Sequence, residues 1–266
     1  MEFSINLRDG RKLIYDHPIV MGIINLTPDS FYEGSRCLDK NGDEESLLRA
    51  RVQKMIEAGA EMIDVGACST RPGYEPPSAA EELRRLEWGL PIVTEVVGGR
   101  MPVSVDTYRA SVAEAAVTRL GADIINDVYG GTRDPEMIEV VNRVGAPFIL
   151  TADSNDVLGF FAQQIAKVHG AQVILDPGYG FSKNVDDNYL WMKRLPELIA
   201  AYPACPMLVG ISRKSMIWRY LGNTPDEALN GTTVLNTFAL LSGAHILRVH
   251  DVSEAVEVVK ITSKLR

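Results

Sequence analysis

Residues 44–65 read EESLLRARVQKMIEAGAEMIDV and pass from one kind of structural element directly into another. Four apolar residues at helical spacing share one face of the first part: Leu48, Val52, Met55 and Ile56. Gly59 ends the helix predicted over Glu44–Ala58, because glycine adopts the left-handed conformation common after a helical C-terminus. The apolar run Met62–Val65 follows at once and predicts a buried strand. This stretch is therefore a helix-to-strand unit of an α/β fold.

The same transition recurs along the chain. Leu120-Gly121-Ala122 and Ser242-Gly243-Ala244 each lead from a helical pattern into an apolar run. Most of the runs are continuously hydrophobic, which is typical of parallel strands covered on both faces. Eight strands are predicted: Ile19–Ile24, Met62–Val65, Val103–Val105, Asp123–Asn126, Pro147–Leu150, Gln172–Leu175, Met207–Gly210 and Ile246–Val249.

Helix signals lie between these strands. Helices are predicted over Thr107–Leu120 and Val157–Val168. Ser78 with Glu81 has capping-box spacing, and Asp134 before a proline predicts an N-cap with proline at the first helical position.

Eight strand–helix units predict a single (β/α)8 TIM barrel, with residues 1–266 as one domain and the active site at the C-terminal face of the strands. A doubly wound open sheet is the main alternative. Its usual nucleotide-binding versions lose support, because no Gly-x-Gly-x-x-Gly follows the first strand and no Walker sequence is present.

Composition narrows the class of protein. Of 266 residues, 46% are hydrophobic and 23% charged, close to the average of globular proteins. The net charge of −8 argues against a general nucleic-acid binder, although a local cationic pocket remains compatible with it. Three cysteines without metal-like spacing, no secretory pattern at the N-terminus and no apolar run of about 18 residues predict a cytoplasmic protein that does not bind membranes.

Polar residues occupy seven of the eight predicted strand ends, the position of active-site residues in barrels. They are Asn25, Cys68 to Gly73, Asp106, Asn126 with Asp127, Asp176, Ser212 to Ser215, and Arg248 to Asp251. Helix capping or turn formation is the favoured interpretation for Asp127 and Asp251 and an alternative for Asp106. Capping does not explain the cations, which are unfavourable at helix N-termini: Arg71, Arg213, Lys214, Arg248 and, when protonated, His250.

This mixture of side chains indicates two kinds of ligand. Cations, hydroxyls and helix N-termini suit a phosphate or diphosphate, and Asn25 offers a neutral oxygen to Mg²⁺. Asp106, Asn126 and Asp176 suit the N–H-rich edge of a nitrogen heterocycle. The two aspartates could alternatively form an acid/base pair.

Seven motifs in this order resemble the dihydropteroate synthase family. They are residues 21–31 (MGIINLTPDSF), 64–73 (DVGACSTRPG), 104–107 (SVDT), 124–127 (IIND), 175–181 (LDPGYGF), 209–216 (VGISRKSM) and 248–251 (RVHD). The resemblance extends from about residue 18 to about residue 260. It implies the (β/α)8 barrel, often as a homodimer, and the condensation of 6-hydroxymethyl-7,8-dihydropterin diphosphate with 4-aminobenzoate in folate biosynthesis, a step inhibited by sulfonamides.

The resemblance also implies roles for individual residues. The pterin edge would be bound by Asp106, Asn126 and Asp176, its ring contacted by Lys214 and its face covered by Arg248. The diphosphate would be held by Asn25, Arg248 and His250, with Mg²⁺ near Asn25. Thr70, Arg71 and Pro72 would belong to a mobile loop over the site, and Phe181, Lys214 and Ser215 would border the aminobenzoate. Ser212 is counted among the substrate-binding residues, and the expected catalytic residues are Asn25, Arg71, Lys214, Arg248 and His250.

One departure from the family pattern keeps other functions open. After the fifth strand the family usually has a His-Met-x-Gly loop and a long segment, whereas here Thr151-Ala152 runs almost at once into the next predicted helix. The alternatives are a pterin-binding paralogue with weak or no synthase activity and, lower in rank, a pterin-dependent methyltransferase.

Overall fold

The computed structural model describes residues 2–26, 44–68 and 75–265. Its centre is an eight-stranded parallel sheet with the order β8-β7-β6-β5-β4-β3-β10-β9. A parallel bridge between Leu175 and Met207 joins β8 to β9 and closes the sheet into a barrel. The strands are β3 Ile19–Asn25, β4 Met62–Gly66, β5 Val103–Asp106, β6 Ile124–Asp127, β7 Phe148–Thr151, β8 Val173–Asp176, β9 Leu208–Val209 and β10 Ile246–Val249.

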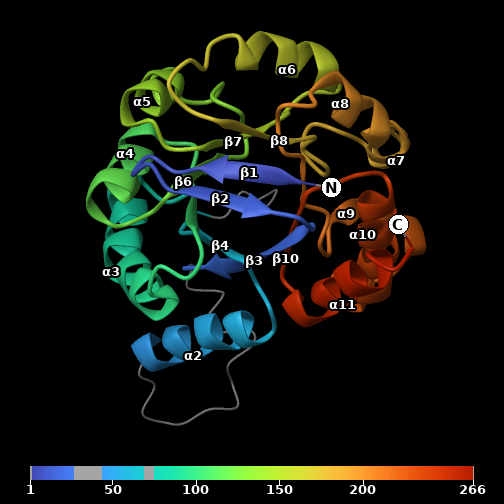
Figure 1. Cartoon of the computed structure of the whole chain (residues 1–266), viewed down its shortest axis with the longest axis horizontal. Coiled ribbons are helices and arrows are strands. Elements are labelled where there is room, and N and C mark those ends of the chain that lie inside the picture. Colours follow the sequence, from blue (N-terminus) through green and yellow to red (C-terminus); the bar gives the residue numbers. More distant parts are fainter. Residues whose placement is uncertain (1, 27–43, 69–74, 266) are drawn as a thin grey trace.

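All eight predicted strands are confirmed, with boundaries that differ by at most one residue. Helices surround the strands as an outer ring (Figure 1). They are α2 Glu44–Glu57, α3 Ala79–Val97, α4 Ala110–Arg119, α5 Met137–Val144, α6 Val157–Ile165, α7 Val185–Lys193, α8 Leu195–Ala201, α9 Ser215–Leu221, the 3₁₀ helix η1 Asp226–Ala228, α10 Leu229–Leu241 and α11 Val252–Thr262. Gly59, Gly121 and Gly243, predicted to end helices, have φ of 96°, 87° and 105°.

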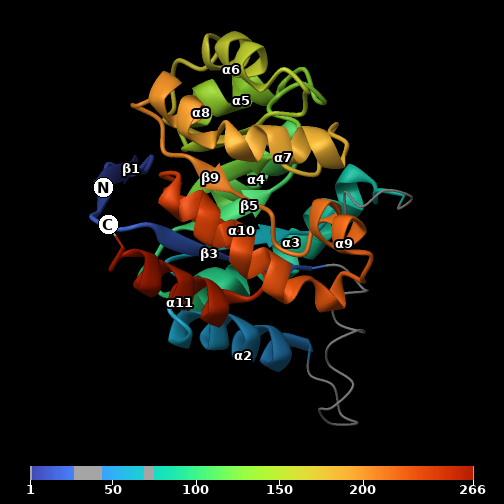
Figure 2. The ribbon, with the colours of Figure 1, turned by 90° about the vertical axis from the view of Figure 1, so that its right-hand side faces the viewer.

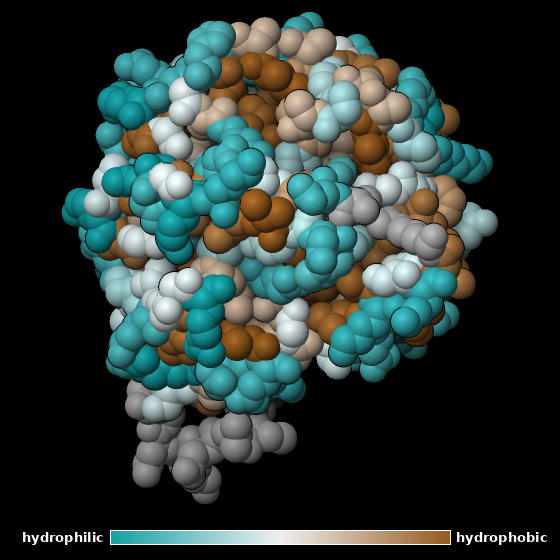
Figure 3. All heavy atoms as spheres, viewed as in Figure 1, coloured by the Kyte–Doolittle hydropathy of each residue, from teal (hydrophilic) through white to brown (hydrophobic). Residues whose placement is uncertain are grey.

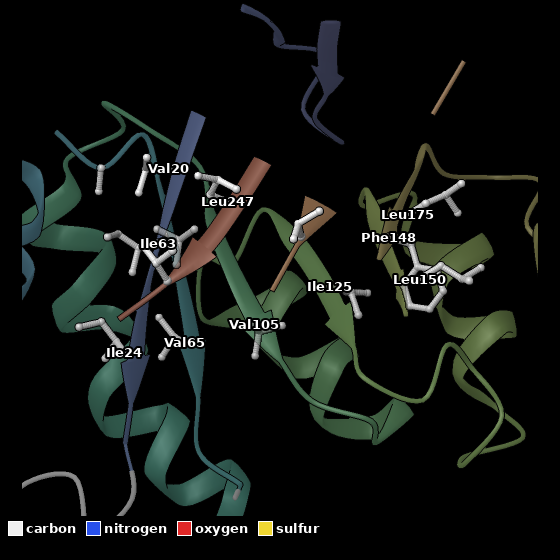
Figure 4. Packing of buried hydrophobic residues seen from close by; sticks show 14 of the residues in the cluster. Val20, Ile24, Ile63, Val65, Val105, Ile125, Phe148, Leu150, Leu175 and Leu247 are labelled. Carbon is white, nitrogen blue, oxygen red and sulfur yellow. The ribbon is translucent and has the colours of Figure 1, made fainter. Parts of the chain in front are cut away.

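Two hydrophobic layers stabilise the barrel. Outward-facing strand residues such as Val20, Ile63 and Val105 lie on neighbouring strands and belong to the cluster between strands and helices (Figure 4). A separate cluster fills the interior near the amino ends of the strands and includes Ile124 and Ile246. The interior is therefore packed, and only its C-terminal end is available for polar side chains.

An N-terminal hairpin, which the sequence analysis missed, covers the amino end of the barrel. Strands β1 Phe3–Asn6 and β2 Lys12–Tyr15 pair antiparallel, and Phe3 and Ile5 pack against the interior cluster. The hairpin crosses the front of the molecule in Figure 1 and lies at one side of it in Figure 2. On the face that it covers, polar side chains surround several separate apolar patches (Figure 3).

Two predicted helix starts and one end are wrong. The helix predicted from Thr107 begins at Ala110. The Ala110 N–H donates a hydrogen bond of 2.8 Å to Asp134 Oδ2. Asp134 therefore caps α4, and α5 begins only at Met137. The helix predicted to Val168 ends at Ile165. The role of Asp134 depends on its contact with Ala110, which lies 24 residues away in the sequence. The residues around Asp134 give no sign of that contact.

The capping prediction at Ser78 is confirmed, since its hydroxyl accepts the Glu81 N–H at 3.2 Å. Among the described helices, none combines the length and apolar composition that a bilayer crossing requires.

Candidate active site at the barrel mouth

The alternating direction of side chains along the strands places the predicted polar residues inside the barrel. Side chains two residues apart on a strand point to the same side. Asn126, Asp176 and Arg248 each follow by two positions an isoleucine of the interior cluster, namely Ile124, Ile174 and Ile246. They are therefore directed to the interior at the carboxyl ends of the strands, which is the mouth of the barrel.

Arg248 is the centre of a buried polar network. Its Nε donates to Asp64 Oδ2 at 2.7 Å, and its Nη2 lies 2.6 Å from the same oxygen and 2.7 Å from Asp106 Oδ2. Asn126 Nδ2 donates to Asp64 Oδ2 at 3.0 Å. The structure thus brings together three of the predicted residues, Asp106, Asn126 and Arg248.

Asp64 joins these three residues and was missed as a site residue. It is fully buried, and its Oδ1 has no hydrogen-bond partner within the part of the chain that the structure describes. A signal was present, because Asp64 is an acid inside the apolar run Met62–Val65. Charged residues are almost never fully buried unless they are paired.

Burial raises the pKa of both predicted aspartates. It raises the pKa of Asp106 to about 7, an effect that Arg248 opposes and Asp64 reinforces. Burial also raises the pKa of Asp176, whereas Lys214 and the Gly178 N–H, which donates to Asp176 Oδ1 at 2.8 Å, oppose this shift. Both carboxyl groups can therefore form hydrogen bonds with a polar ligand buried at the mouth.

Lys214 and Phe181 lie together on the other side of the mouth. The Lys214 ammonium donates to the Tyr179 carbonyl at 2.5 Å and lies 4.4 Å from the centre of the Phe181 ring. Burial lowers the pKa of Lys214 to about 8, and Asp176 counteracts this effect. The arrangement offers one cation and one aromatic face to a ligand.

Ser212 orients His250. Its Oγ accepts the His250 backbone N–H at 3.2 Å and lies 3.0 Å from His250 Nδ1. His250 keeps an exposed surface, yet the surrounding protein and the neighbouring Arg248 lower the pKa of its ring to about 4. The imidazolium considered from the sequence is therefore not the form of the free protein at pH 7, where the neutral ring can donate one N–H.

Three strand-end residues serve the fold. Arg213, expected among the converging cations, pairs with Asp251 through two contacts of 2.8 and 2.9 Å. Asp251 makes no side-chain cap to α11, so the capping interpretation is wrong there. For Asp127 the turn interpretation is confirmed, since it accepts the N–H groups of Tyr129 and Gly131.

The remaining predicted residues are placed in part. Asn25 ends β3, half-buried, and Ser215 begins α9. Thr70, Arg71 and Pro72 lie outside the described residues. Within the described ranges, no group of three or more His, Cys, Asp or Glu side chains is arranged to hold a metal ion.

The short connection after β7 is fastened to the next loop. Lys183, which sequence reasoning also missed, donates from Nζ to the carbonyls of Ala152, Gly178 and Phe181 at 2.9, 3.1 and 3.3 Å. Ser182 Oγ hydrogen-bonds to Asp153 Oδ1. The loop after β8 thus supports the short segment and holds Phe181 at the mouth.

Comparison with known proteins agrees with this geometry. Residues 21–250 match the family of pterin binding enzymes. The chain is 39% identical to the dihydropteroate synthase of Escherichia coli K12 over 277 aligned residues, covering 95% of this chain and 93% of that protein. The Bacillus subtilis dihydropteroate synthase is 38% identical, with 91% of this chain and 87% of that protein covered.

Solved structures show the same likeness. The Xanthomonas albilineans dihydropteroate synthase with 4-aminobenzoic acid has a TM-score of 0.85 at 30% identity, covering 100% of this chain and 98% of that one. The Coxiella burnetii dihydropteroate synthase in complex with pteroic acid has a TM-score of 0.83 at 31% identity, covering 99% and 98%. Together with the barrel and its polar mouth, these matches show that the chain is a transferase of the pterin binding enzyme family and belongs to its dihydropteroate synthases.

Proposed function

We propose that this chain condenses 6-hydroxymethyl-7,8-dihydropterin diphosphate with 4-aminobenzoate to give 7,8-dihydropteroate and diphosphate. The observation that carries the proposal is the joined set of Asp106, Asn126 and Arg248 at the mouth of a family barrel. Carboxyl and amide groups at this depth can pair with the N–H groups of a pterin edge. Relatives whose structures hold 4-aminobenzoic acid and pteroic acid support the same pair of substrates.

The proposed reaction depends on stabilising a leaving group. The reacting CH₂ group is attached to an electron-rich ring that can delocalise positive charge, so breaking the C–O bond requires groups that bind the departing diphosphate. Arg248 supplies a permanent cation, and His250 donates a hydrogen bond from its neutral ring. An aromatic amine is mostly neutral at pH 7, and the step therefore needs no strong general base.

Mg²⁺ belongs to the proposal as a cofactor. Asn25 at the end of β3 would supply one neutral oxygen, and the donor set fits a Mg²⁺ ion that keeps waters and binds substrate phosphates. When bound, the ion would neutralise charge on the leaving diphosphate.

The direct test incubates the purified chain with the pterin diphosphate, 4-aminobenzoate and Mg²⁺. Release of diphosphate together with dihydropteroate is expected, and the absence of dihydropteroate at high enzyme concentration would overturn the proposal. Calorimetry then tests the pocket: Lys214→Ala and Asp176→Asn are each expected to weaken pterin binding. The exposed Asp186 on α7 provides the matched control, because Asp186→Asn makes the same change outside the mouth.

The short connection after β7 favours one alternative function. Only Ala152 to Asp156 separate β7 from α6, whereas the family usually has a long loop that helps to wall the pterin pocket. If this alternative holds, the chain would bind the pterin in the calorimetric assay yet release little or no product.

A homodimer is part of the proposal. Helices α10 and α11 lie side by side at the surface (Figure 2). Val234, Phe238 and Leu241 expose 59%, 41% and 51% of their surface on one face of α10, and Ile261 and Leu265 expose 63% and 67% near the end of α11. An apolar patch of this kind suits a two-fold interface. Sedimentation equilibrium is expected to give twice the mass of 29.2 kDa. A cytoplasmic location and inhibition by sulfonamides remain predictions from the sequence.

A further inference from the structure

Arg51 on α2 is a half-buried cation that the proposed mechanism does not use. Burial lowers the pKa of its guanidinium, and no carboxylate of the described residues contributes an opposing effect. It makes no ion pair or hydrogen bond with any residue of the described ranges. An arginine so placed carries a desolvation cost that an anionic ligand would offset.

The packing of α2 against α11 places Arg51 at the level of the barrel mouth. A Cβ on Gly59 would lie 3.3 Å from Val256, and a Cβ on Gly22 would touch both Met55 and Val252. Residue 59 is thus level with residue 256, and residue 55 with residue 252. The helices run in the same direction, so Arg51, one turn before Met55, is level with the residues that precede α11.

Those residues include His250 and Asp251. Long side chains on a helix point back toward its N-terminus, and α2 begins at the end of the barrel where the strands finish. The guanidinium is accordingly directed toward the mouth. Its positive charge acts on His250, since Arg51 is one of the cations that lower the pKa of that ring.

The other described arginines that act on His250 are already paired with carboxylates. From β10, Arg248 is paired with Asp64 and Asp106, and from the segment after β9, Arg213 is paired with Asp251. Arg51 is the remaining cation of those that act on His250 and has no partner in the described parts of the chain. Among the described cations that act on His250, Arg51 is therefore the one most available to a ligand.

We propose that Arg51 is a further anion-binding residue, which binds the diphosphate group of the substrate together with His250. This inference rests on the proposed function, because it identifies the ligand with the leaving group of that reaction. Its position on a helix, outside the strand ends, explains why a search of strand ends did not find it.

Calorimetric titration with inorganic diphosphate in the presence of Mg²⁺ tests the inference. Arg51→Met keeps the length of the side chain and removes its charge, and we expect affinity for diphosphate to fall about tenfold, as for loss of a charge-assisted hydrogen bond. Binding of 6-hydroxymethyl-7,8-dihydropterin, which has no diphosphate, is expected to stay within about twofold.

Arg49→Met is the matched control. Arg49 lies on the same helix but pairs with Glu45 and Glu95 at the surface, so the variant makes the same change in net charge away from the mouth. Its affinity for diphosphate is expected to equal that of the wild type. A folded Arg51→Met variant that also retains wild-type affinity would overturn the inference, as would a wild-type chain that binds no diphosphate at millimolar concentration.

A second readout separates ligand binding from a structural role. Loss of the Arg51 charge is expected to raise the pKa of His250, followed by NMR of the ring, while Arg49→Met leaves it unchanged. Neither readout requires turnover. If the chain forms no dihydropteroate but Arg51→Met weakens diphosphate binding, the proposed reaction is overturned. The anion-binding role of Arg51 is then still supported.

Discussion

Asp64 holds Arg248 through a single oxygen: Nε and Nη2 of Arg248 lie 2.7 and 2.6 Å from Asp64 Oδ2. The same oxygen accepts Asn126 Nδ2. One fully buried carboxylate thereby orients two side chains that are proposed to touch the substrate.

Replacing Asp64 is expected to affect both stability and activity. Asp64→Asn leaves the Arg248 charge with Asp106 alone, and breaking a buried pair costs about 3 kcal/mol in the free energy of unfolding. The catalytic efficiency should fall at least tenfold because Arg248 loses its fixed orientation. Urea denaturation and steady-state kinetics measure the two effects. A variant as stable and active as the wild type would show that Asp106 alone positions Arg248.

The pH dependence of activity should reflect Lys214. Its pKa of about 8 means that the ammonium is lost as pH rises above 8, and catalytic efficiency should fall in that range. Stability should respond in the opposite direction: between about pH 8 and 10.5 the unfolded chain binds more protons at this side chain, so this contribution to stability rises with pH. In Lys214→Arg the alkaline limb should be absent. An unchanged limb in that variant would assign the titration to another group.

Asp134 should matter for stability and not for catalysis. It accepts the Ala110 N–H with one oxygen and the Glu136 N–H, at 3.1 Å, with the other. Asp134→Ala should lower the free energy of unfolding by about 1–2 kcal/mol, as for loss of a helix cap, and leave the Michaelis constants unchanged. Asp134→Asn retains one acceptor, and its loss should be smaller. Equal losses in the two variants would argue against the capping role.

The N-terminal hairpin provides a matched pair of isoleucines. Ile5 is fully buried against the barrel interior, whereas Ile14 is 64% exposed on the neighbouring strand. Ile5→Ala should cost about 3 kcal/mol, while Ile14→Ala should change stability by less than about 0.5 kcal/mol. Chemical denaturation checks both values. Similar losses at the two positions would mean that the hairpin does not act as a cover for the core.

The barrel could be predicted because its elements are encoded locally. Continuous apolar runs such as Ile19–Ile24 and glycines such as Gly59 mark strands and helix ends wherever they occur in the chain. The hairpin was missed because its strands are short and only Phe3, Ile5 and Leu7 are buried, a pattern with little local signal. Helix starts that depend on a distant cap, as at Ala110, were likewise outside local reasoning.

The amino-acid sequence by itself determined the order of strands and helices, the residues at the strand ends and the resemblance to a family, because these depend on neighbours along the chain. Only the tertiary structure decided how those strand ends are used. Arg213 and Asp251 neutralise each other, Asp64 becomes the anchor of Arg248, and Arg51 has no partner among the described residues while its charge acts on His250. Charges are paired and buried when the fold brings distant residues together across the barrel. The spacing of these residues in the sequence does not show which of them will meet.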